Sequence, residues 1–421
     1  MHFDLKYGKI TNPLDIKEEC ILDIIYPKKK SPPEDTHAAV EIALKKPLGT
    51  EPLVTMLKKR QPKRLVIVVN DITRPTPYSS LMPPLLRSIE ESGVPRENVT
   101  LITATGIHRP HTPEENLQVY GRELVENYRI VCHDAEDDEN LVRKGTLPSG
   151  YDFLLNRVVD EADFLITIGV VMPHFFAGYS GGRKSILPGV SGKSTVQLNH
   201  ARMVELMDDL PPVRENPISL EMIHAARIAG VDFILNAVTD DNGTMIDVYA
   251  GDLEDAWYAA VDTSEELYVT EIRELADICI ASASGHPRDI NIYQAQKALD
   301  HADKATRPGG TIILVADCSG GYGDQVFEDF MRAGLSPEGI MKRVKEDFIM
   351  GGHKAYCFAK VAAEKRVILV SNVSKEETAT LFAKKAASPQ EALNESLRRH
   401  EKGARVRVLP EGGITVPALL T

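Results

Sequence analysis

The chain has 421 residues, and its 43% hydrophobic and 26% charged residues are ordinary for a soluble globular protein. This length predicts two or three domains, and the formal net charge of -12 argues against a nucleic-acid-binding surface. The first residues lack a signal-peptide pattern, and no apolar run reaches the ~20 residues of a membrane helix, so we expect no membrane partner. Five cysteines are scattered without a CxxC pair, which is typical of reduced thiols in a cytoplasmic protein.

Strand-like and helix-like segments alternate through the first 268 residues. Short apolar runs predict strands over Arg64 to Asn70, Val99 to Ala104, Tyr128 to Cys132, Phe164 to Val171 and Phe233 to Val238. Helical spacing predicts helices over Tyr78 to Ser92, Thr112 to Tyr120 and Asp252 to Leu267. The second of these begins with Thr112 as a candidate N-cap and Glu115 three residues later. This alternation is typical of a mostly parallel α/β sheet with helices on both faces.

The same alternation restarts after residue 275. It predicts strands over Ala276 to Ala281, Thr311 to Ala316 and Val367 to Val370, and helices over Asn291 to Thr306, His353 to Glu364 and Ser388 to Lys402. We therefore predict two α/β domains, residues 1–268 and residues 275–409, each a mostly parallel sheet flanked by helices. Residues 410–421 are a candidate for a C-terminal segment that packs back on the first domain.

Polar, glycine-rich loops follow several of the predicted strands. Residues 71–75, 105–110 and 173–185 do so in the first domain, and residues 284–287 and 317–321 do so in the second. Ligands of parallel α/β sheets bind at the carboxyl ends of the strands. We therefore expect an active site in the crevice between the two domains.

The most informative loop contains Gly178, Gly181 and Gly182 and then Lys184. A glycine-rich turn after a buried strand can present backbone N–H groups and one amine to an anionic ligand. A lysine in such a turn can contact a phosphate or, when its amine is deprotonated, form a covalent bond. The loop therefore predicts a cofactor- or phosphate-binding site.

This loop does not match a P-loop, because Arg183 occupies the place of the second glycine. The segment from Gly192 to Thr195 ends like a P-loop, but Leu187 replaces its first glycine. A P-loop-like phosphotransferase that uses residues 178–195 therefore stays open as an alternative.

Two histidines, His108 and His174, each follow a predicted strand beside a glycine or proline turn. A lone histidine is more often structural, but two at converging strand ends can exchange protons from opposite faces of one carbon, as racemisation requires. Arg74, which follows Asp71, Ile72 and Thr73, suits bidentate binding of a carboxylate or phosphate.

Two further candidate sites lie on predicted helices. His200 can bind nickel, zinc, copper or iron, although no second protein ligand is found one helical turn away. Tyr293, Gln294 and Lys297 share one face of the first helix of the second domain, where the lysine can neutralise a substrate carboxylate.

Four segments, in this order, resemble the nickel-pincer-dependent lactate racemases and their 2-hydroxyacid racemase relatives. They are residues Asp71 to Pro75, Ala104 to Pro110, Pro173 to Gly189 and the pair Asn199-His200. The resemblance covers the whole chain and implies an isomerase that racemises or epimerises a short 2-hydroxyacid. In the implied reaction the C2 hydrogen leaves as hydride, a planar 2-keto acid remains, and the hydride returns to either face.

The resemblance also implies a cofactor and a role for each candidate residue. The cofactor is nickel(II) pyridinium-3,5-bisthiocarboxylate mononucleotide, which cofactor-biosynthesis proteins supply. Lys184 would hold it as a thioamide, and His200 would ligate the nickel. Its nucleotide would be bound by Asp71, Ile72, Thr73, Arg74, Gly178, Gly181 and Gly182. His108 and His174 would be the acid/base pair, and the substrate would contact Tyr293, Gln294 and Lys297.

The sequence departs from the family at one position. Tyr356, shortly after the turn Gly351-Gly352-His353, stands where the family has a tryptophan in the pocket. A tyrosine changes the volume and polarity of the pocket, so the substrate stays open between lactate, malate, another short 2-hydroxyacid and a sugar acid. A non-catalytic metabolite sensor is a further alternative, from a different class of protein.

Overall fold

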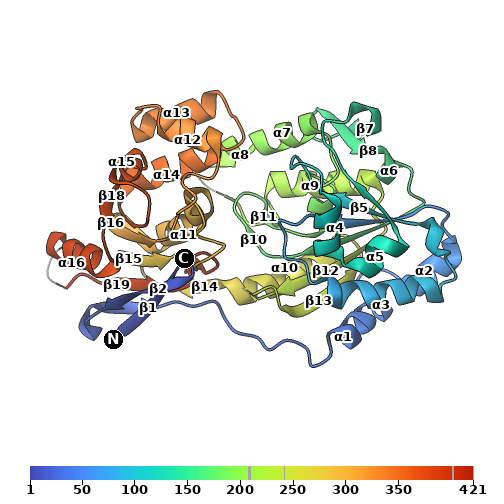
Figure 1. Cartoon of the computed structure of the whole chain (residues 1–421), viewed down its shortest axis with the longest axis horizontal. Helices are drawn as coiled ribbons and strands as arrows, with labels where there is room; N and C mark the ends of the chain where they lie inside the picture. The colour runs from blue at the N-terminus through green and yellow to red at the C-terminus, as the bar shows by residue number, and fades with distance from the viewer. Residues whose placement is uncertain (207–209, 241, 401–402, 421) are drawn as a thin grey trace. The chain divides into compact units, whose positions relative to one another are not determined.

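The computed structural model describes residues 1–206, 210–240, 242–400 and 403–420, and the chain forms two compact units (Figure 1). The large unit is Lys30–Glu265, and the small unit combines Met1–Lys29 with Glu266–Thr421. Each unit is built on one six-stranded sheet, which confirms the predicted α/β class. Among the described residues, we find no helix with the length and apolarity needed to cross a membrane.

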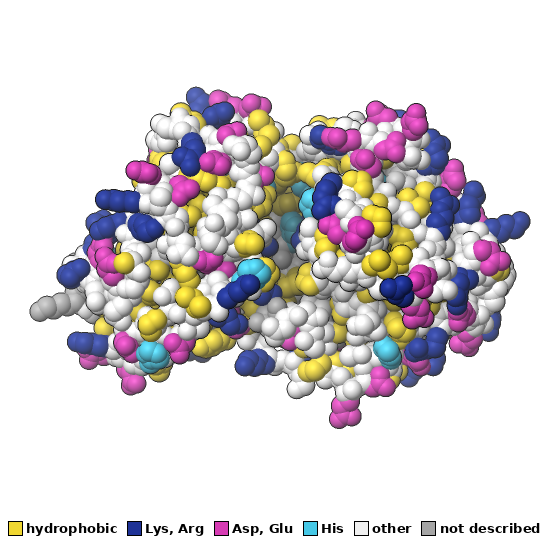
Figure 2. All heavy atoms as spheres, in the orientation of Figure 1, with side chains coloured by type: hydrophobic (Ala, Val, Ile, Leu, Met, Phe, Trp, Pro, Cys, Tyr) yellow, Lys and Arg dark blue, Asp and Glu magenta, His cyan; other side chains and the backbone are white. Residues whose placement is uncertain are grey.

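Acidic and basic side chains are mixed over the surface of each unit on the face shown in Figure 2. Several of them form ion pairs, such as Arg227 with both Asp252 and Glu254. Exposed pairs of this kind each contribute only about 0–1 kcal/mol to stability, so the fold depends mainly on its buried residues.

The large unit alternates strands and helices along the chain. Its main sheet contains β4 (Leu65–Asn70), β5 (Val99–Ala104), β6 (Arg129–Cys132), β9 (Phe164–Val170), β12 (Phe233–Thr239) and β13 (Met245–Gly251). Two ribbons add β7 (Leu141–Thr146) with β8 (Asp152–Asn156), and β10 (Pro173–His174) with β11 (Gly178–Tyr179). The helices are α1 (Thr36–Lys45), α2 (Leu53–Arg60), α3 (Tyr78–Glu91), α4 (Pro113–Tyr120), α5 (Arg122–Asn127), α6 (Arg157–Asp160), α7 (Lys193–Ala201), α8 (Met203–Leu206), α9 (Pro217–Ala229) and α10 (Asp255–Tyr268).

The main sheet of the large unit has the strand order β13-β12-β9-β4-β5-β6. All neighbouring strands are parallel except β12 and β13, which are antiparallel. Every residue of β9 and β12 is buried, as expected for strands with helices on both faces. The predicted capping box is also present, because the side chains of Thr112 and Glu115 each accept a hydrogen bond from the other residue's backbone N–H at the start of α4.

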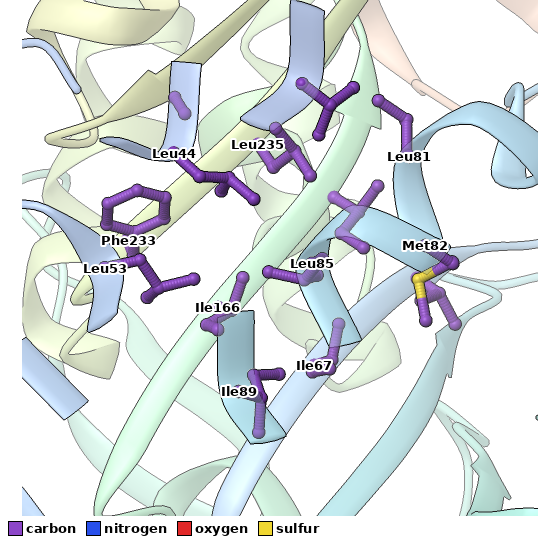
Figure 3. Close-up of a cluster of buried hydrophobic side chains, with 14 of the residues drawn as sticks. Leu44, Leu53, Ile67, Leu81, Met82, Leu85, Ile89, Ile166, Phe233 and Leu235 are labelled. Atoms are coloured by element: carbon purple, nitrogen blue, oxygen red, sulfur yellow. The ribbon is translucent and has the colours of Figure 1, made fainter. Parts of the chain in front are cut away.

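One face of this sheet packs against α1, α2 and α3, and the apolar side chains of the strands and these helices form a hydrophobic core (Figure 3). Alternate residues of the strands, such as Ile67, Ile166 and Leu235, contribute to this face because side chains alternate along a strand. Strands β4, β9 and β12 also contact a short 3-10 helix, η4 (Gly182–Ser185), which contains Lys184. The glycine-rich loop therefore folds back onto the sheet.

The small unit has a fully parallel sheet in the order β18-β17-β16-β15-β19-β3. Its strands are β3 (Ile21–Ile24), β15 (Ala276–Ser282), β16 (Thr306–Val315), β17 (Arg366–Val370), β18 (Ala383–Ala386) and β19 (Val406–Leu409), with β1 (His2–Tyr7), β2 (Ile10–Asp15), β14 (Val269–Ile272) and β20 (Val416–Leu419) in smaller sheets. Its helices are α11 (Ile292–Ala305), α12 (Gln325–Met331), α13 (Pro337–Glu346), α14 (Gly352–Glu364), α15 (Lys375–Thr380) and α16 (Pro389–Arg399). The end of the helix predicted over Ser388 to Lys402 lies outside the described residues.

The division of the chain corrects the predicted domain limits at both ends. Residues 1–29, expected in the first domain, belong to the small unit. The hairpin β1–β2 buries Phe3, Leu5 and Tyr7 in the core of that unit, and β3 pairs with β19. The C-terminal segment also stays in the small unit, because β20 pairs with β14. These long-range pairings bury apolar faces that the two segments cannot bury alone.

Candidate active site

Three loops of the large unit begin at the carboxyl ends of neighbouring strands. β9, β4 and β5 are adjacent and parallel in the sheet, and they lead into the loops that contain His174, Asp71 and His108. This is the sheet edge at which α/β proteins bind ligands. The fold therefore places His108 and His174 on loops from the same edge of one sheet.

His108 is paired with Asp71, since its Nδ1 lies 2.8 Å from Oδ2 of that carboxylate. Asp71 is nearly buried, whereas the side chain of His108 is 53% exposed. Burial alone would raise the pKa of Asp71, but the hydrogen bonds from His108 and Thr73 outweigh it and lower this pKa. The ionised carboxylate accepts the Nδ1–H, so Nε2 of His108 is left as the proton acceptor.

The loop that contains Asp71 is held by its own residues and by a neighbouring histidine. The Oγ1 of Thr73 donates to Oδ1 of Asp71 at 2.6 Å. The backbone N–H of Ile72 donates to Nε2 of His111 at 2.9 Å, while the side chain of Ile72 is exposed. His111 thus helps to hold the loop in place.

His174 lies beside Lys184. The two-residue ribbon β10–β11 places His174 opposite Gly178. In this position Nε2 of His174 is 2.8 Å from Nζ of Lys184. Burial, and to a lesser extent the charges of Arg74 and Arg183, hold the pKa of Lys184 well below its ordinary value. The neutral amine of Lys184 is therefore favoured.

Phe176 connects Lys184, His174 and His200. Its ring packs edge-on against the rings of His174 and His200, with centroid distances of 4.7 and 4.8 Å. Nζ of Lys184 lies 5.0 Å from the centroid of the same ring. Burial lowers the pKa of His200 to about 3, so its imidazole is neutral at physiological pH. A neutral imidazole is the form that binds a transition metal.

Arg183, noticed in the sequence only because it breaks the P-loop pattern, is fully buried behind the glycine-rich loop. Its guanidinium donates to the carbonyls of Ala177 and Tyr179, each at 2.7 Å. It stacks 3.7 Å from the ring centroid of Trp257, whose Nε1 donates to the Ser180 carbonyl. The guanidinium thus holds the loop in place by binding two of its backbone carbonyl groups.

The glycines of the loop are required by the protein itself. Gly182 has φ +50°, and a Cβ there would lie 2.8 Å from Cδ1 of Trp257. Its N–H donates to Oδ1 of Asn236 at 3.0 Å, so this N–H is already used. A Cβ on Gly178 would lie 2.7 Å from Val213. Both glycines therefore permit close packing, and the N–H of Gly182 is not available to a phosphate.

The segment from Gly192 to Thr195 does not form a P-loop. The backbone N–H of Gly192 donates to the Leu154 carbonyl, and Oγ1 of Thr195 is buried between the backbones of Asp152 and Leu154. Lys193 forms an exposed ion pair with Glu136. These three residues are engaged within the protein, so the segment lacks the phosphate-binding arrangement of a P-loop.

His133 is a structural residue. It is fully buried, its Nε2 lies 3.0 Å from the Ser191 carbonyl, and its Nδ1 lies 3.1 Å from Nδ2 of Asn156. Burial lowers the pKa of His133 to about 4, although the hydrogen bond to Ser191 opposes this shift. Both ring nitrogens are therefore used within the protein.

The three remaining candidates lie on α11 of the small unit. Tyr293 and Gln294 are half-buried, and Lys297 is exposed. The ring of Tyr293 packs edge-on to His353 with a centroid distance of 6.0 Å, and Nζ of Lys354 lies 5.0 Å from the Tyr293 ring. Tyr356 of α14 is 1% exposed. The predicted face of α11 therefore packs, in part, on α14.

Several residues that build the site were missed by sequence reasoning. Asn236 is a polar residue inside the apolar strand β12, and Trp257 is the single tryptophan of the chain, so both had a visible signal. Glu221 is a buried carboxylate on the apolar helix α9, which is a similar signal. Phe176 had none, because an aromatic residue in a loop is common.

Comparison with known proteins gives matches over both units. The family model of the lactate racemase N-terminal domain matches residues 7–208, and that of the lactate racemase C-terminal domain matches residues 272–416. A lactate racemase from Lactiplantibacillus plantarum is 34% identical over 429 aligned residues, which cover 97% of this chain and 98% of that protein. A lactate racemase from Thermoanaerobacterium thermosaccharolyticum is 33% identical and covers 98% of each chain.

Two solved structures are similar. The lactate racemase apoprotein from Thermoanaerobacterium thermosaccharolyticum has a TM-score of 0.91 at 31% sequence identity, covering 99% of this chain and 100% of that chain. A protein from Thermotoga maritima has a TM-score of 0.68 at 18% identity, covering 93% of this chain and 100% of that chain, which shows a shared fold.

Proposed function

Since this chain belongs to the lactate racemase family and is an isomerase, we propose that it racemises a short 2-hydroxyacid, with lactate as the first candidate. The observation that carries this proposal is the grouping around Lys184. Its amine lies 2.8 Å from His174 and beside the same phenylalanine as the neutral His200. His108, the second imidazole of the acid/base pair, lies on the same sheet edge with Asp71 as its partner.

We also propose that the cofactor is nickel(II) pyridinium-3,5-bisthiocarboxylate mononucleotide, joined covalently to Lys184. The residues fit such a group in two respects. Burial favours the neutral amine of Lys184, which is the form that can react, and the neutral imidazole of His200, which is the form that ligates nickel. Within residues 1–206, 210–240, 242–400 and 403–420, no cluster of three His, Cys, Asp or Glu side chains could hold a metal alone. A nickel ion at His200 would therefore take its other donors from the cofactor.

When bound, this cofactor supplies an acceptor for the C2 hydrogen of the substrate. The protein residues would manage the hydroxyl proton and the charges. Asp71 fixes the tautomer of His108 that accepts a proton at Nε2, so His108 can take the substrate's hydroxyl proton. His174 would do the same for the other enantiomer. Two imidazoles are needed because the hydroxyl group occupies a different position in each enantiomer.

The remaining candidates would bind anionic groups. Arg74 is exposed, and its charge acts on Lys184, which suits contact with the phosphate of a nucleotide attached there. Asp71, Ile72, Thr73 and the glycine-rich loop would complete the nucleotide site. The family resemblance assigns the substrate carboxylate to Gln294 and Lys297 of the small unit, and it names Tyr293 as a further substrate contact.

The experiment that tests this function is a substrate screen. The chain would be produced together with the cofactor-biosynthesis proteins and nickel, and then incubated with single enantiomers of lactate, malate and other short 2-hydroxyacids. Chiral chromatography should show loss of optical purity for at least one acid, and a His108→Asn variant produced in the same way should show none. Full retention of optical purity by nickel-loaded protein across the panel would reject the proposal.

A further inference from the structure

Helix α9 contacts both elements that present residues to the proposed cofactor. Its N-cap Asn216 donates from Nδ2 to the carbonyl of Phe176 at 2.7 Å, which anchors the glycine-rich loop. On the first turn, Oγ of Ser219 accepts a hydrogen bond from the guanidinium of Arg183 at 3.0 Å. Both bonds are buried. The start of α9 therefore holds the loop that contains Lys184.

The second contact of α9 is made by Glu221, two residues after Ser219. Its Oε2 accepts a hydrogen bond from Nδ2 of Asn199 at 2.9 Å. Asn199 directly precedes His200 on α7. The same helix is thus bonded to the loop of the attachment lysine and to the helix of the metal-binding histidine.

Glu221 is built to hold a fixed position. Its side chain is 1% exposed. Its carboxylate also accepts hydrogen bonds from the backbone N–H of Ser149, at 3.1 Å, and from the hydroxyl of Tyr151. The guanidinium of Arg202 forms an ion pair with Oε2 at 3.4 Å. Burial alone would raise the pKa of Glu221, but the hydrogen bonds from Ser149, Tyr151 and Asn199 outweigh it and lower this pKa. A buried carboxylate is costly unless it is paired in this way, so each donor restricts where the carboxylate can lie.

We infer that α9 is a brace that sets the spacing between Lys184 and His200. Ser219, through Arg183, positions the lysine, and Glu221, through Asn199, positions the histidine. The inference rests on the proposed function, because a group joined covalently to one residue and ligated by the other requires both to be held in place. Asn216, Ser219 and Glu221 are thus positioning residues, which act through Phe176, Arg183 and Asn199.

The test uses two variants, Ser219→Ala and Glu221→Gln, and a matched control, Asp232→Asn. Asp232 is also a carboxylate that accepts a backbone hydrogen bond, from Leu165, but it lies at the amino ends of β9 and β12, away from the brace. In the chain without cofactor, acetic anhydride would label Lys184 and diethyl pyrocarbonate would label His200. Peptide mass spectrometry would give both rates, and thermal unfolding would report stability.

If α9 acts as this brace, each variant should affect only one of the two sites. Ser219→Ala should change the labelling rate of Lys184 by roughly fivefold, the factor expected for the loss of one hydrogen bond, and leave His200 unchanged. Glu221→Gln should change His200 by a similar factor and leave Lys184 unchanged. Asp232→Asn should lower the unfolding temperature without changing either rate. Equal changes at both sites in either brace variant, or the same changes in Asp232→Asn, would overturn the inference.

A second measurement separates this inference from the proposed function. In protein produced with the cofactor machinery, Glu221→Gln should keep the mass adduct on Lys184 and lose bound nickel, whereas Ser219→Ala should reduce the adduct. If wild-type protein has no adduct, the proposed function fails while the labelling pattern still decides the brace. Should Glu221→Gln not fold, Glu221→Asp, which keeps the charge and withdraws it by one methylene, takes its place in both measurements.

Discussion

Nζ of Lys184 lies 2.8 Å from Nε2 of His174. Two cations at this distance in a buried site would repel each other, and burial lowers the pKa of Lys184. The two groups are therefore not both charged, and burial favours the neutral amine of Lys184, which is the protonation state that the proposed covalent attachment requires.

The first prediction follows from this pairing. In the chain without cofactor, Lys184 should react with acetic anhydride at neutral pH, where ordinary lysines are protonated. The pH at which its labelling rate is half-maximal should lie below the ordinary lysine pKa of 10.5, because the amine loses its proton at lower pH. Peptide mass spectrometry across pH, with the exposed Lys193 as the internal reference, measures this. A midpoint at or above 10.5 would show that Lys184 is protonated in the site.

The second prediction concerns Asp71→Asn. An amide at this position can donate to Nδ1 of His108 and would favour the tautomer that has its proton on Nε2. That tautomer cannot accept the substrate's hydroxyl proton, so kcat should fall by roughly 10²–10⁴-fold, the range seen when a histidine loses its orienting carboxylate. Initial rates from chiral chromatography measure the fall, and each rate is divided by the fraction of Lys184 that has the mass adduct, because Asp71 is also proposed to bind the nucleotide. A kcat close to that of wild-type protein would remove the dyad from the mechanism.

The third prediction separates hydride transfer from proton abstraction at C2. If the C2 hydrogen moves as a hydride within the closed site, 2-deuterated lactate racemised in ordinary water should keep its deuterium in both enantiomers. If a histidine removes it as a proton, the label should exchange with solvent. Mass spectrometry of the re-isolated acid after partial racemisation decides between the two, and washout of the label would refute the hydride route.

The fourth prediction concerns the glycine-rich loop. Gly182→Ala places a side chain at φ +50° and brings its Cβ to 2.8 Å from Trp257, so both backbone strain and overpacking apply. We expect a loss of about 2–4 kcal/mol of unfolding free energy. Gly150→Ala is the matched control, since Gly150 has φ +87° and nothing within 4 Å of the added Cβ. It should lose only about 1 kcal/mol. Equal losses in urea titrations would show that the Trp257 contact is unimportant.

The fifth prediction is a pH dependence of stability. His133 has a folded pKa of about 4 against an ordinary value of 6.5, so the unfolded chain binds a proton there first as pH falls. Its contribution is complete above about pH 6.5 and falls by about 2–3 kcal/mol on going to pH 4.5. His133→Gln cannot titrate and should lose less stability over this interval. Urea unfolding followed by the fluorescence of Trp257, the single tryptophan, reports this for the large unit. Identical pH slopes for both proteins would contradict the assignment.

Part of this site could be predicted from sequence for a simple geometric reason. The apolar runs of β4, β5 and β9 identify buried parallel strands, and such strands end at one edge of their sheet. The residues that follow them, Asp71, His108 and His174, are therefore expected at one edge before any coordinates exist. Their pairing with specific partners, such as His174 with Lys184, depends on loop conformation and was not predictable.

The supporting residues were hidden for a different reason. Arg183 binds backbone carbonyls and Ser219, and a carbonyl partner leaves no mark in the sequence. The N-terminal hairpin had a readable alternation, with Phe3, Leu5 and Tyr7 on one face, but nothing local states that this face belongs to the small unit. Long-range burial decided its place, and sequence order suggested the wrong domain.

The central claim is that Lys184 is the attachment point of the cofactor that the racemase needs. Its most direct test is peptide mass spectrometry of Lys184 in protein produced with the cofactor-biosynthesis proteins, with racemase activity measured on the same sample. The account predicts a cofactor adduct on Lys184 and activity that rises in proportion to the modified fraction. Fully active protein in which Lys184 is unmodified would contradict it.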